Sequence, residues 1–127
     1  MALVSDRPIP GFPYQLLDPA EEIRGQAEAD EGAVLVTDRR LAVSLETGRL
    51  DLDVPFDALR RIQFDLERIR PATLVIVPEH PKDPPIVLVV RPSQYGAMAQ
   101  AIAEIGTALH GTERDRRARI SVDEAAD

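Results

Sequence analysis

The segment AVLVTDRRLAV, residues 33–43, decides how this chain folds, because two apolar runs flank four polar residues. Short apolar runs bounded by turn-forming residues are typical of buried strands. Asp38 can accept hydrogen bonds from the backbone that follows it, which favours a tight turn at residues 37–40. The segment therefore predicts an antiparallel pair of strands with two arginines, Arg39 and Arg40, at the turn.

The residues that follow this hairpin continue the strand pattern. In LDLDVPF (50–56) apolar side chains alternate with aspartates, which predicts a strand with one buried face. Pro55 lacks a backbone N–H, so this strand is expected at the edge of a sheet. RIQFDLE (61–67) alternates in the same way, and the β-branched runs ATLVIV (72–77) and PIVLVV (85–90) predict two more buried strands. Because nothing polar interrupts PIVLVV, we expect that strand to be central in its sheet or covered.

One amphipathic helix follows the last of these strands. Apolar residues recur at spacings of three and four between residues 92 and 111, which is the pattern of a helix with one buried face. This face consists of Tyr95, Met98, Ile102, Ile105 and Leu109. A single amphipathic helix after a run of strands has to bury its face against a sandwich or a barrel. The order of elements therefore predicts a mainly β domain that is capped by one C-terminal helix.

The segment DPAEEIRGQAEADEG, residues 18–32, carries two competing signals. Asp18 and Pro19, followed by two glutamates, are typical of the start of a helix. From Glu22 onwards, small or apolar residues alternate with polar ones, which is typical of a strand. The local pattern leans slightly towards a helix and allows either structure. We interpret the segment as one helical turn followed by a strand, for a reason given below.

Prolines and charges divide the chain into three parts. Residues 1–20 contain four prolines and predict an extended arm rather than a helix. Residues 21–111 carry the periodic patterns and form the domain. Residues 112–127 hold few apolar groups and a basic run followed by an acidic run, which is typical of a disordered tail.

The order of these segments resembles that of the bacterial pleckstrin-homology-like (PH-like) and GRAM-like domains. The resemblance covers residues 16–111. It rests on LLDPAEEI (16–23), GAVLVTDRRLAV (32–43), VPFDALRRIQF (54–64), ATLVIV (72–77) and the closing helix. It implies a seven-stranded β-sandwich or partly open barrel, made of two nearly orthogonal sheets, with the C-terminal helix at one open end. It also implies a first strand within residues 18–32, which is why we favour the turn and strand there.

The composition of the 127-residue chain excludes several classes of protein. There is no cysteine, which removes disulfides, thiolate metal ligands and thiol nucleophiles. The net charge of −7 opposes nonspecific nucleic-acid binding and a polybasic membrane contact, because both depend on lysine and arginine. The N-terminus lacks a signal-peptide pattern, and no apolar run approaches the ~20 residues that span a membrane. We therefore expect a cytoplasmic protein, and the arginine- and alanine-rich composition is typical of a bacterial one.

Arg39 and Arg40 are the first candidate anion contact. Guanidinium groups suit bidentate contacts with phosphate, so this pair could bind a phosphorylated ligand. The alternative is a hairpin turn in which both side chains lie in solvent or pair with nearby carboxylates. In that case glutamine at both positions would change stability by only ~0–1 kcal/mol, as is usual for exposed ion pairs. We favour the hairpin turn because of the charges around it.

Arg60 and Arg61 are the second candidate contact, on a strand face that also carries acidic residues. A mixed face of this kind is typical of an exposed strand surface. In phosphoinositide-binding PH domains the basic residues surround the first hairpin loop. The corresponding loop here is EADEG (28–32), which is acidic and would repel a phosphorylated headgroup. The lipid site of that family therefore carries over to no residue of this sequence.

The sequence contains no catalytic or metal-binding constellation. Its four serines lie outside any nucleophile-elbow pattern, and there is no glycine-rich phosphate loop. The two histidines, His80 and His110, have no cysteine or third histidine to complete a metal site. We therefore expect no enzyme activity, no cofactor and no bound metal.

The remaining class of function is a non-catalytic protein-interaction module. An extended peptide could add as a strand to a sheet edge or to the groove between an edge strand and the helix. The arm supplies the candidate interaction residues Phe12, Tyr14, Leu16 and Leu17, which we expect to fold onto the domain or onto a second copy. The partner is then another protein or the same chain in a homo-oligomer. Peripheral binding to a membrane or anionic lipid through the arginine pair is the alternative, which the acidic charge disfavours.

Overall fold

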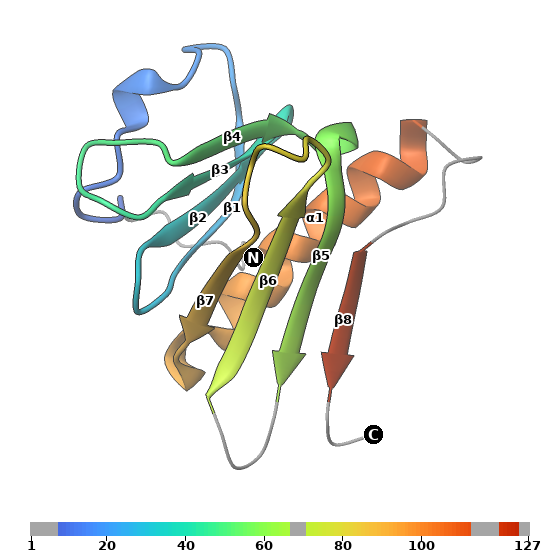
Figure 1. Ribbon diagram of the computed structural model, residues 1–127. Helices are drawn as coiled ribbons and strands as arrows, with labels where there is room; N and C mark the ends of the chain where they lie inside the picture. Colours follow the sequence, from blue (N-terminus) through green and yellow to red (C-terminus); the bar gives the residue numbers. More distant parts are fainter. Residues whose placement is uncertain (1–7, 67–70, 113–119, 125–127) are drawn as a thin grey trace.

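Figure 1 shows two four-stranded sheets and one helix in the computed structural model, which describes residues 8–66, 71–112 and 120–124. The strands of the two sheets cross at a steep angle, and their inner faces enclose a shared core. The first sheet consists of β1 (Ile23–Glu28), β2 (Ala33–Thr37), β3 (Arg40–Ser44) and β4 (Leu52–Pro55). The second sheet consists of β7 (Ile86–Val90), β6 (Ala72–Pro78), β5 (Leu59–Leu66) and β8 (Ile120–Glu124). The antiparallel strands β1–β7 confirm the predicted mainly β sandwich.

Helix α1 (Tyr95–Thr112) covers this core and confirms the predicted C-terminal helix. Of the predicted apolar face, Met98, Ile102 and Ile105 are at most 1% exposed, and the two outer members are partly buried against the same core. The helix contacts β1 and β2 of the first sheet and β8 of the second. The helix therefore joins the two sheets.

Gly25 allows α1 to lie close to β1. A Cβ atom on Gly25 would lie 2.8 Å from the Cα atom of Ala101 on the helix, which is closer than such atoms approach one another. Ala101 is itself fully buried, so two small residues set the spacing between helix and strand. Gly25 is one of the small residues that make the secondary structure of residues 18–32 ambiguous in the sequence. The close packing of α1 on β1 requires a small residue at this position.

The segment from residue 18 forms a hydrogen-bonded turn and then the predicted strand, and the turn is not helical, contrary to our interpretation. The N–H of Glu21 donates to the Asp18 carbonyl at 2.9 Å, and the N–H of Asp18 donates to the Glu21 carboxylate at 2.8 Å. The helix-start signal is therefore satisfied within one turn. The simple alternation predicted for β1 does not hold, because the strand bulges before Gly25 and buries Gly25, Gln26 and Ala27 in succession.

The turn between β2 and β3 forms where the sequence predicts it, with a different hydrogen-bond acceptor. The Oγ1 atom of Thr37 accepts the backbone N–H groups of Arg39, at 3.0 Å, and of Arg40, at 3.1 Å. Asp38, which we expected in this role, instead accepts the N–H of Glu22 at 2.9 Å. Thr37 therefore closes the hairpin, and Asp38 ties the hairpin to the start of β1.

The N-terminal arm is only partly extended. We use "the arm" for residues 8–17, which include the 3₁₀ turn η1 (Tyr14–Leu16) although the sequence predicts no helix there. Pro13 is the N-cap of this turn, and the N–H groups of Leu16 and Leu17 close the turn by donating to the carbonyls of Pro13 and Tyr14 at 3.0 Å each. The arm lies on the outer face of the first sheet, and residues 1–7 lie outside the described part of the chain.

The segment predicted to be a disordered tail contains a strand. Residues 120–124 form β8, which pairs in parallel with β5 over five residue pairs, from Ile62↔Ile120 to Leu66↔Glu124. The alternation of Ile120 and Val122 with polar residues is the strand signal that the strong charges around it hide. Residues 113–119 and 125–127 of the predicted tail lie outside the described residues.

The predicted position of the strand in its sheet is correct for β4 and wrong for β7. Strand β4 is an edge strand, as its proline predicts. Strand β7 is also an edge strand rather than a central one, and Val87 on it is 54% exposed. The expected cover is present at one residue: Val89 accepts the N–H of Asp30 at 2.8 Å and donates to the carboxylate of Glu31 at 2.8 Å. The tip of the β1–β2 hairpin therefore closes one corner of the sandwich.

Candidate functional site

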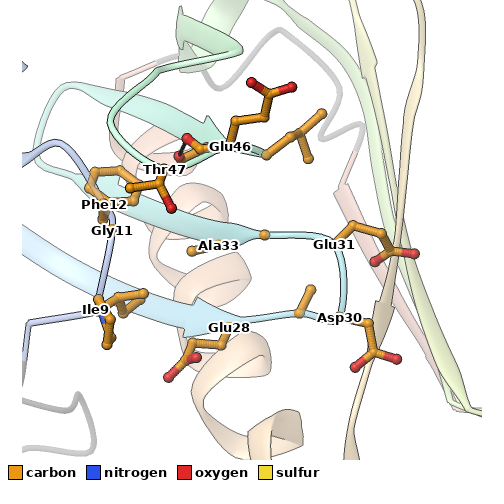
Figure 2. A pocket seen from close by; sticks show the side chains of 14 residues that line it. Ile9, Gly11, Phe12, Glu28, Asp30, Glu31, Ala33, Glu46 and Thr47 are labelled. Carbon is orange, nitrogen blue, oxygen red and sulfur yellow. Dashed lines mark hydrogen bonds between the residues drawn. The ribbon is translucent and has the colours of Figure 1, made fainter.

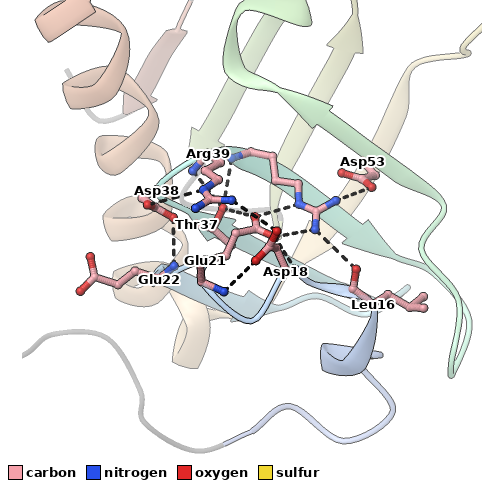
Figure 3. A network of polar contacts seen from close by, with 10 residues as sticks. Leu16, Asp18, Glu21, Glu22, Thr37, Asp38, Arg39 and Asp53 are labelled. Atoms are coloured by element: carbon pink, nitrogen blue, oxygen red, sulfur yellow. Dashed lines mark hydrogen bonds and ion pairs between the residues drawn. The ribbon is translucent and has the colours of Figure 1, made fainter.

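The guanidinium group of Arg40 hydrogen-bonds to the carboxylates of Glu21 and Asp53 rather than lying in solvent. Figure 3 shows these two carboxylates within the surrounding network of polar contacts. Arg40 is the first residue of β3, and its Nε and Nη2 atoms donate to the two carboxylate oxygens of Glu21 at 2.8 and 2.5 Å. Its Nη1 atom donates to Asp53 at 2.6 Å. The Glu21 side chain is only 2% exposed and that of Arg40 is 20% exposed. The result is a largely buried, bidentate ion pair, which is the strong form of this contact.

Glu21 is also fixed by two neutral donors. It accepts the hydroxyl of Thr37 at 2.7 Å and the backbone N–H of Asp18 at 2.8 Å. These contacts, above all the hydrogen bonds from Arg40, lower the pKa of Glu21 from its ordinary value of 4.5 to about 2. In turn, the hydrogen bonds that Arg40 donates to the carboxylates of Glu21 and Asp53 raise the pKa of Arg40. The network therefore locks the start of β1, the β2–β3 hairpin and β4 together.

The two neighbouring arginines of the hairpin thus have different surroundings. Arg40 already donates hydrogen bonds to two carboxylates, and the negative charges of these carboxylates would repel a phosphate. Arg39 is half exposed and lies 3.6 Å from Asp18 and 3.9 Å from Asp38. These positions support the hairpin turn over the anion site. The expectation that glutamine at both positions is nearly neutral is revised for Arg40, because its partner Glu21 is buried.

The second pair of arginines lies on a different sheet. Arg60 and Arg61 are exposed residues of β5. Arg61 donates to the side chain of Gln63, which donates in turn to Asp65 at 2.7 Å. This row of alternate residues is the mixed polar face that the sequence predicts for the strand.

The Glu21 pKa predicts an acid-dependent contribution to stability. Because the pKa is lower in the folded chain than in the unfolded one, the contribution is complete above pH 4.5 and is lost as the pH falls towards 2. The shift corresponds to about 3 kcal/mol. In urea unfolding, the wild-type chain should exceed Glu21→Gln in stability by about this amount at pH 7, and the difference should shrink as the pH falls from 4.5 to about 2. A difference that does not change with pH would contradict this assignment.

A pocket of about 210 Å³ lies at one end of the first sheet (Figure 2). The arm, the β1–β2 loop and the loop after β3 surround it. Its acidic residues are Glu28, Asp30, Glu31 and Glu46. Its described lining includes neither lysine nor arginine. The geometry therefore supports the prediction that the first hairpin loop repels a phosphorylated headgroup.

The four candidate residues of the arm do not share one environment. Phe12 is 6% exposed and packs against the outer face of the first sheet, and Leu17 is partly buried beside it. The hydroxyl of Tyr14 donates to Gln26 at 2.6 Å. Leu16 is 52% exposed. The arm thus folds onto its own domain, and it covers a sheet face instead of the predicted groove between an edge strand and the helix.

The edge beside the helix is occupied by the tail. Strand β8 lies along the free edge of β5 and contacts α1 (Figure 1). An edge of this kind is the candidate surface that the sequence predicts, but the segment that lies on it was not predicted. The signal that could have found it is the short apolar–polar alternation of residues 120–124.

The described residues contain neither a membrane-spanning helix nor a cluster of metal ligands. No described helix combines the length and the apolar character needed to cross a membrane. Among these residues, no group of three or more histidine, aspartate or glutamate side chains is placed to hold a metal ion.

The arrangement of two antiparallel sheets and a C-terminal helix defines a fold of the PH-like class. A crystal structure of a DUF1696 family protein with a pleckstrin-homology domain, from Shewanella loihica PV-4, is similar with a TM-score of 0.53 and 17% identity. The match covers 73% of this chain and 85% of that chain. The N-terminal PH domain of Vps36 has a TM-score of 0.48 and 16% identity, over 75% of this chain and 86% of that one. No model of a known protein family matches the chain, and no curated protein matches it.

The chain therefore has a PH-like fold, as the sequence resemblance implies. At this level of identity the likeness concerns the fold alone.

Proposed function

We propose that this protein is a non-catalytic interaction module that binds an extended segment of another protein as a strand along β5. One observation carries the proposal: the edge of β5 already holds such a segment, the chain's own β8, in parallel register over five residue pairs. Extended peptides commonly bind by adding a strand to a sheet edge. The expectation of a cytoplasmic protein stays a prediction.

The shape of β5 supports strand addition. At eight residues, β5 is longer than the other described strands, and β6 occupies only one of its edges. Without β8 the other edge would expose unpaired backbone groups, which proteins normally cover. Helix α1 contacts β8 and therefore forms one wall of the site.

The side chains of β5 indicate which segments fit. Ile62 and Phe64 point into the core and are fully buried, whereas Gln63 and Asp65 lie on the opposite, polar face. A strand added beside β5 continues both faces, so it should alternate apolar and polar residues. The sequence of β8, ISVDE, has this alternation.

The charges support a protein partner over the lipid alternative. The chain carries a net charge of −7, and the pocket at the first hairpin loop is acidic. Both features oppose an anionic membrane surface. Arg40, one of the two arginines of the hairpin, is already paired with Glu21 and Asp53.

A peptide exchange experiment in the full chain tests the proposal. In a parallel pair, alternate residues direct their N–H groups to the neighbouring strand, so Ser121→Pro with Val122→Pro removes at least one ladder donor of β8. A labelled peptide of residues 118–127 (ARISVDEAAD) should bind this double variant at least about tenfold more tightly than it binds the wild type, because the tethered β8 no longer competes. Fluorescence anisotropy measures the affinities.

The matched control is the same peptide with proline at both positions, ARIPPDEAAD, which should not bind. Circular dichroism checks that the double variant keeps its fold. A folded double variant that binds the peptide no better than the wild type would contradict strand addition along β5.

A further inference from the structure

The outer face of the first sheet is apolar where a solvent-facing sheet would be polar. Val34, Val36 and Leu41 point into the main core, so the intervening residues face outwards. These outward residues are Ala33, Leu35 and Ala42, and each is at most 5% exposed. Antiparallel sheets with one solvated face usually carry polar residues there. The face is therefore built to be covered by an apolar segment.

The segment that covers it presents two aromatic rings, one residue apart. Phe12 packs on Ala33, Leu35 and Ala42, where the two alanines leave room for a ring. The rings of Phe12 and Tyr14 lie 4.9 Å apart and are tilted by 50°. The face thus accommodates a Phe-X-Tyr segment.

A buried amide on the same face fixes the position of the tyrosine hydroxyl. Gln26 of β1 is 5% exposed, and its Oε1 atom accepts the Tyr14 hydroxyl at 2.6 Å. The hydroxyl in turn accepts the backbone N–H of Ile9 at 2.7 Å. A site that hydrogen-bonds a hydroxyl discriminates against the analogue without it, because the buried acceptor would lose that hydrogen bond. Tyrosine is therefore preferred over phenylalanine at this position.

The arm is held mainly by side chains. Its described backbone hydrogen bonds are mostly internal, and one backbone bond reaches the sheet's loops, from the Gly48 N–H to the Gly11 carbonyl at 2.8 Å. Arg40 reaches the Leu16 carbonyl at 3.5 Å. By contrast, the turn that follows the arm is anchored through Glu21 and Arg40. The contacts that hold the arm are therefore distinct from the ion pair that holds the start of β1.

The arm also leaves space beside it. The pocket of about 210 Å³ is lined by Ile9, Gly11 and Phe12 on one side and by the loops of the sheet on the other (Figure 2). Leu16, at the other end of the arm, is 52% exposed. The pocket therefore leaves room beside the arm for a bulkier segment.

From these observations we propose that the outer face of the first sheet is a second peptide-binding site, and that the arm is its displaceable internal ligand. The occupant is a segment of another protein that contains the pattern Phe-X-Tyr, with one residue between the two aromatic residues. This site is separate from the β5 edge and does not depend on the function proposed for that edge.

Competition between the arm and a peptide in the full chain tests this proposal. The probe is a labelled peptide of residues 8–17, PIPGFPYQLL. In the wild type the tethered arm competes at an effective concentration in the millimolar range, so the probe should bind weakly. Phe12→Ala weakens the arm and should tighten probe binding at least about tenfold, as measured by fluorescence anisotropy. Leu16→Ala, a change in an exposed residue of the same arm, should leave probe binding at the wild-type level.

Changes in the probe test the chemistry of the site without affecting the fold of the chain. Replacing the probe's phenylalanine by alanine should abolish binding to the Phe12→Ala chain, and replacing its tyrosine by phenylalanine should weaken binding several-fold. If Phe12→Ala does not fold, Tyr14→Phe serves as the milder variant and should also tighten probe binding relative to the wild type. A folded variant that binds the probe no better than the wild type would disprove the proposal.

Light scattering separates a foreign partner from a second copy of the chain. The proposal predicts the same molecular mass for the wild type and for Phe12→Ala. A wild-type dimer that becomes a monomer on Phe12→Ala would assign this face to self-association and contradict the proposal.

Discussion

Arg40→Gln should lower the free energy of unfolding by about 3–5 kcal/mol at neutral pH. The guanidinium of Arg40 donates two hydrogen bonds to the Glu21 carboxylate, which is only 2% exposed, and supplies its positive counter-charge. Glutamine is too short and uncharged, so the Glu21 charge would remain buried without its counterion. Removal of one member of a buried pair is costly for this reason, even where the intact pair adds little to stability. Urea unfolding followed by circular dichroism measures the loss.

The neighbouring arginine provides the matched control. Arg39 is half exposed, and its carboxylate contacts are 3.6 and 3.9 Å long. Arg39→Gln should therefore change the free energy of unfolding by no more than ~1 kcal/mol. Equal, small effects at both positions would show that the Glu21 carboxylate is not a buried charge in solution.

The contrast between the two arginines shows where sequence analysis stops. Both residues belong to the predicted hairpin turn, and that turn is confirmed. Their difference depends on Glu21, which lies 19 residues before Arg40 and joins it only through the fold. A local pattern identifies the turn, but it does not contain the position of the buried carboxylate.

The periodicity of apolar residues predicts the buried face correctly in elements that have only one face on the core. The alternation around Ile62 and Phe64 predicts the buried face of β5, and both side chains are fully buried. Spacings of three and four predict the face of α1 in the same way. The sequence predicts these elements because each has a single face on the core. The buried side chains of such an element recur at one regular spacing, which is visible in the sequence.

The pattern fails where a second layer covers an element. Strand β1 has α1 on one side and the arm on the other, so Gly25, Gln26 and Ala27 are buried in succession and the alternation disappears. Strand β8 is short and lies among charged residues, and its pairing with β5 is a contact between distant segments. Long-range contacts of this kind leave little trace in the composition of the segment itself.

The candidate binding residues were predicted in part. The apolar residues of the arm identified a segment that needs cover, and Phe12 is buried on the domain. The surface beneath it was not predicted, because Ala33, Leu35 and Ala42 are read from the sequence as members of continuous buried strands. Gln26 was not predicted either, since a polar residue in a strand is normally assigned to the solvent face.

Ile102→Ala should destabilise the fold by roughly 2–5 kcal/mol, the usual range for truncating a large aliphatic side chain in a packed core. Ile102 is 1% exposed and lies in the core that α1 shares with both sheets. Thr107→Ala, an exposed position of the same helix, is the matched control and should change stability by no more than about 0.5 kcal/mol. Because α1 joins β1 to β8, the cavity left by Ile102→Ala should also weaken the attachment of β8, and amide hydrogen exchange in residues 120–124 should accelerate more than in β2. A loss below about 0.5 kcal/mol for Ile102→Ala in urea unfolding would mean that the helix does not hold the two sheets together.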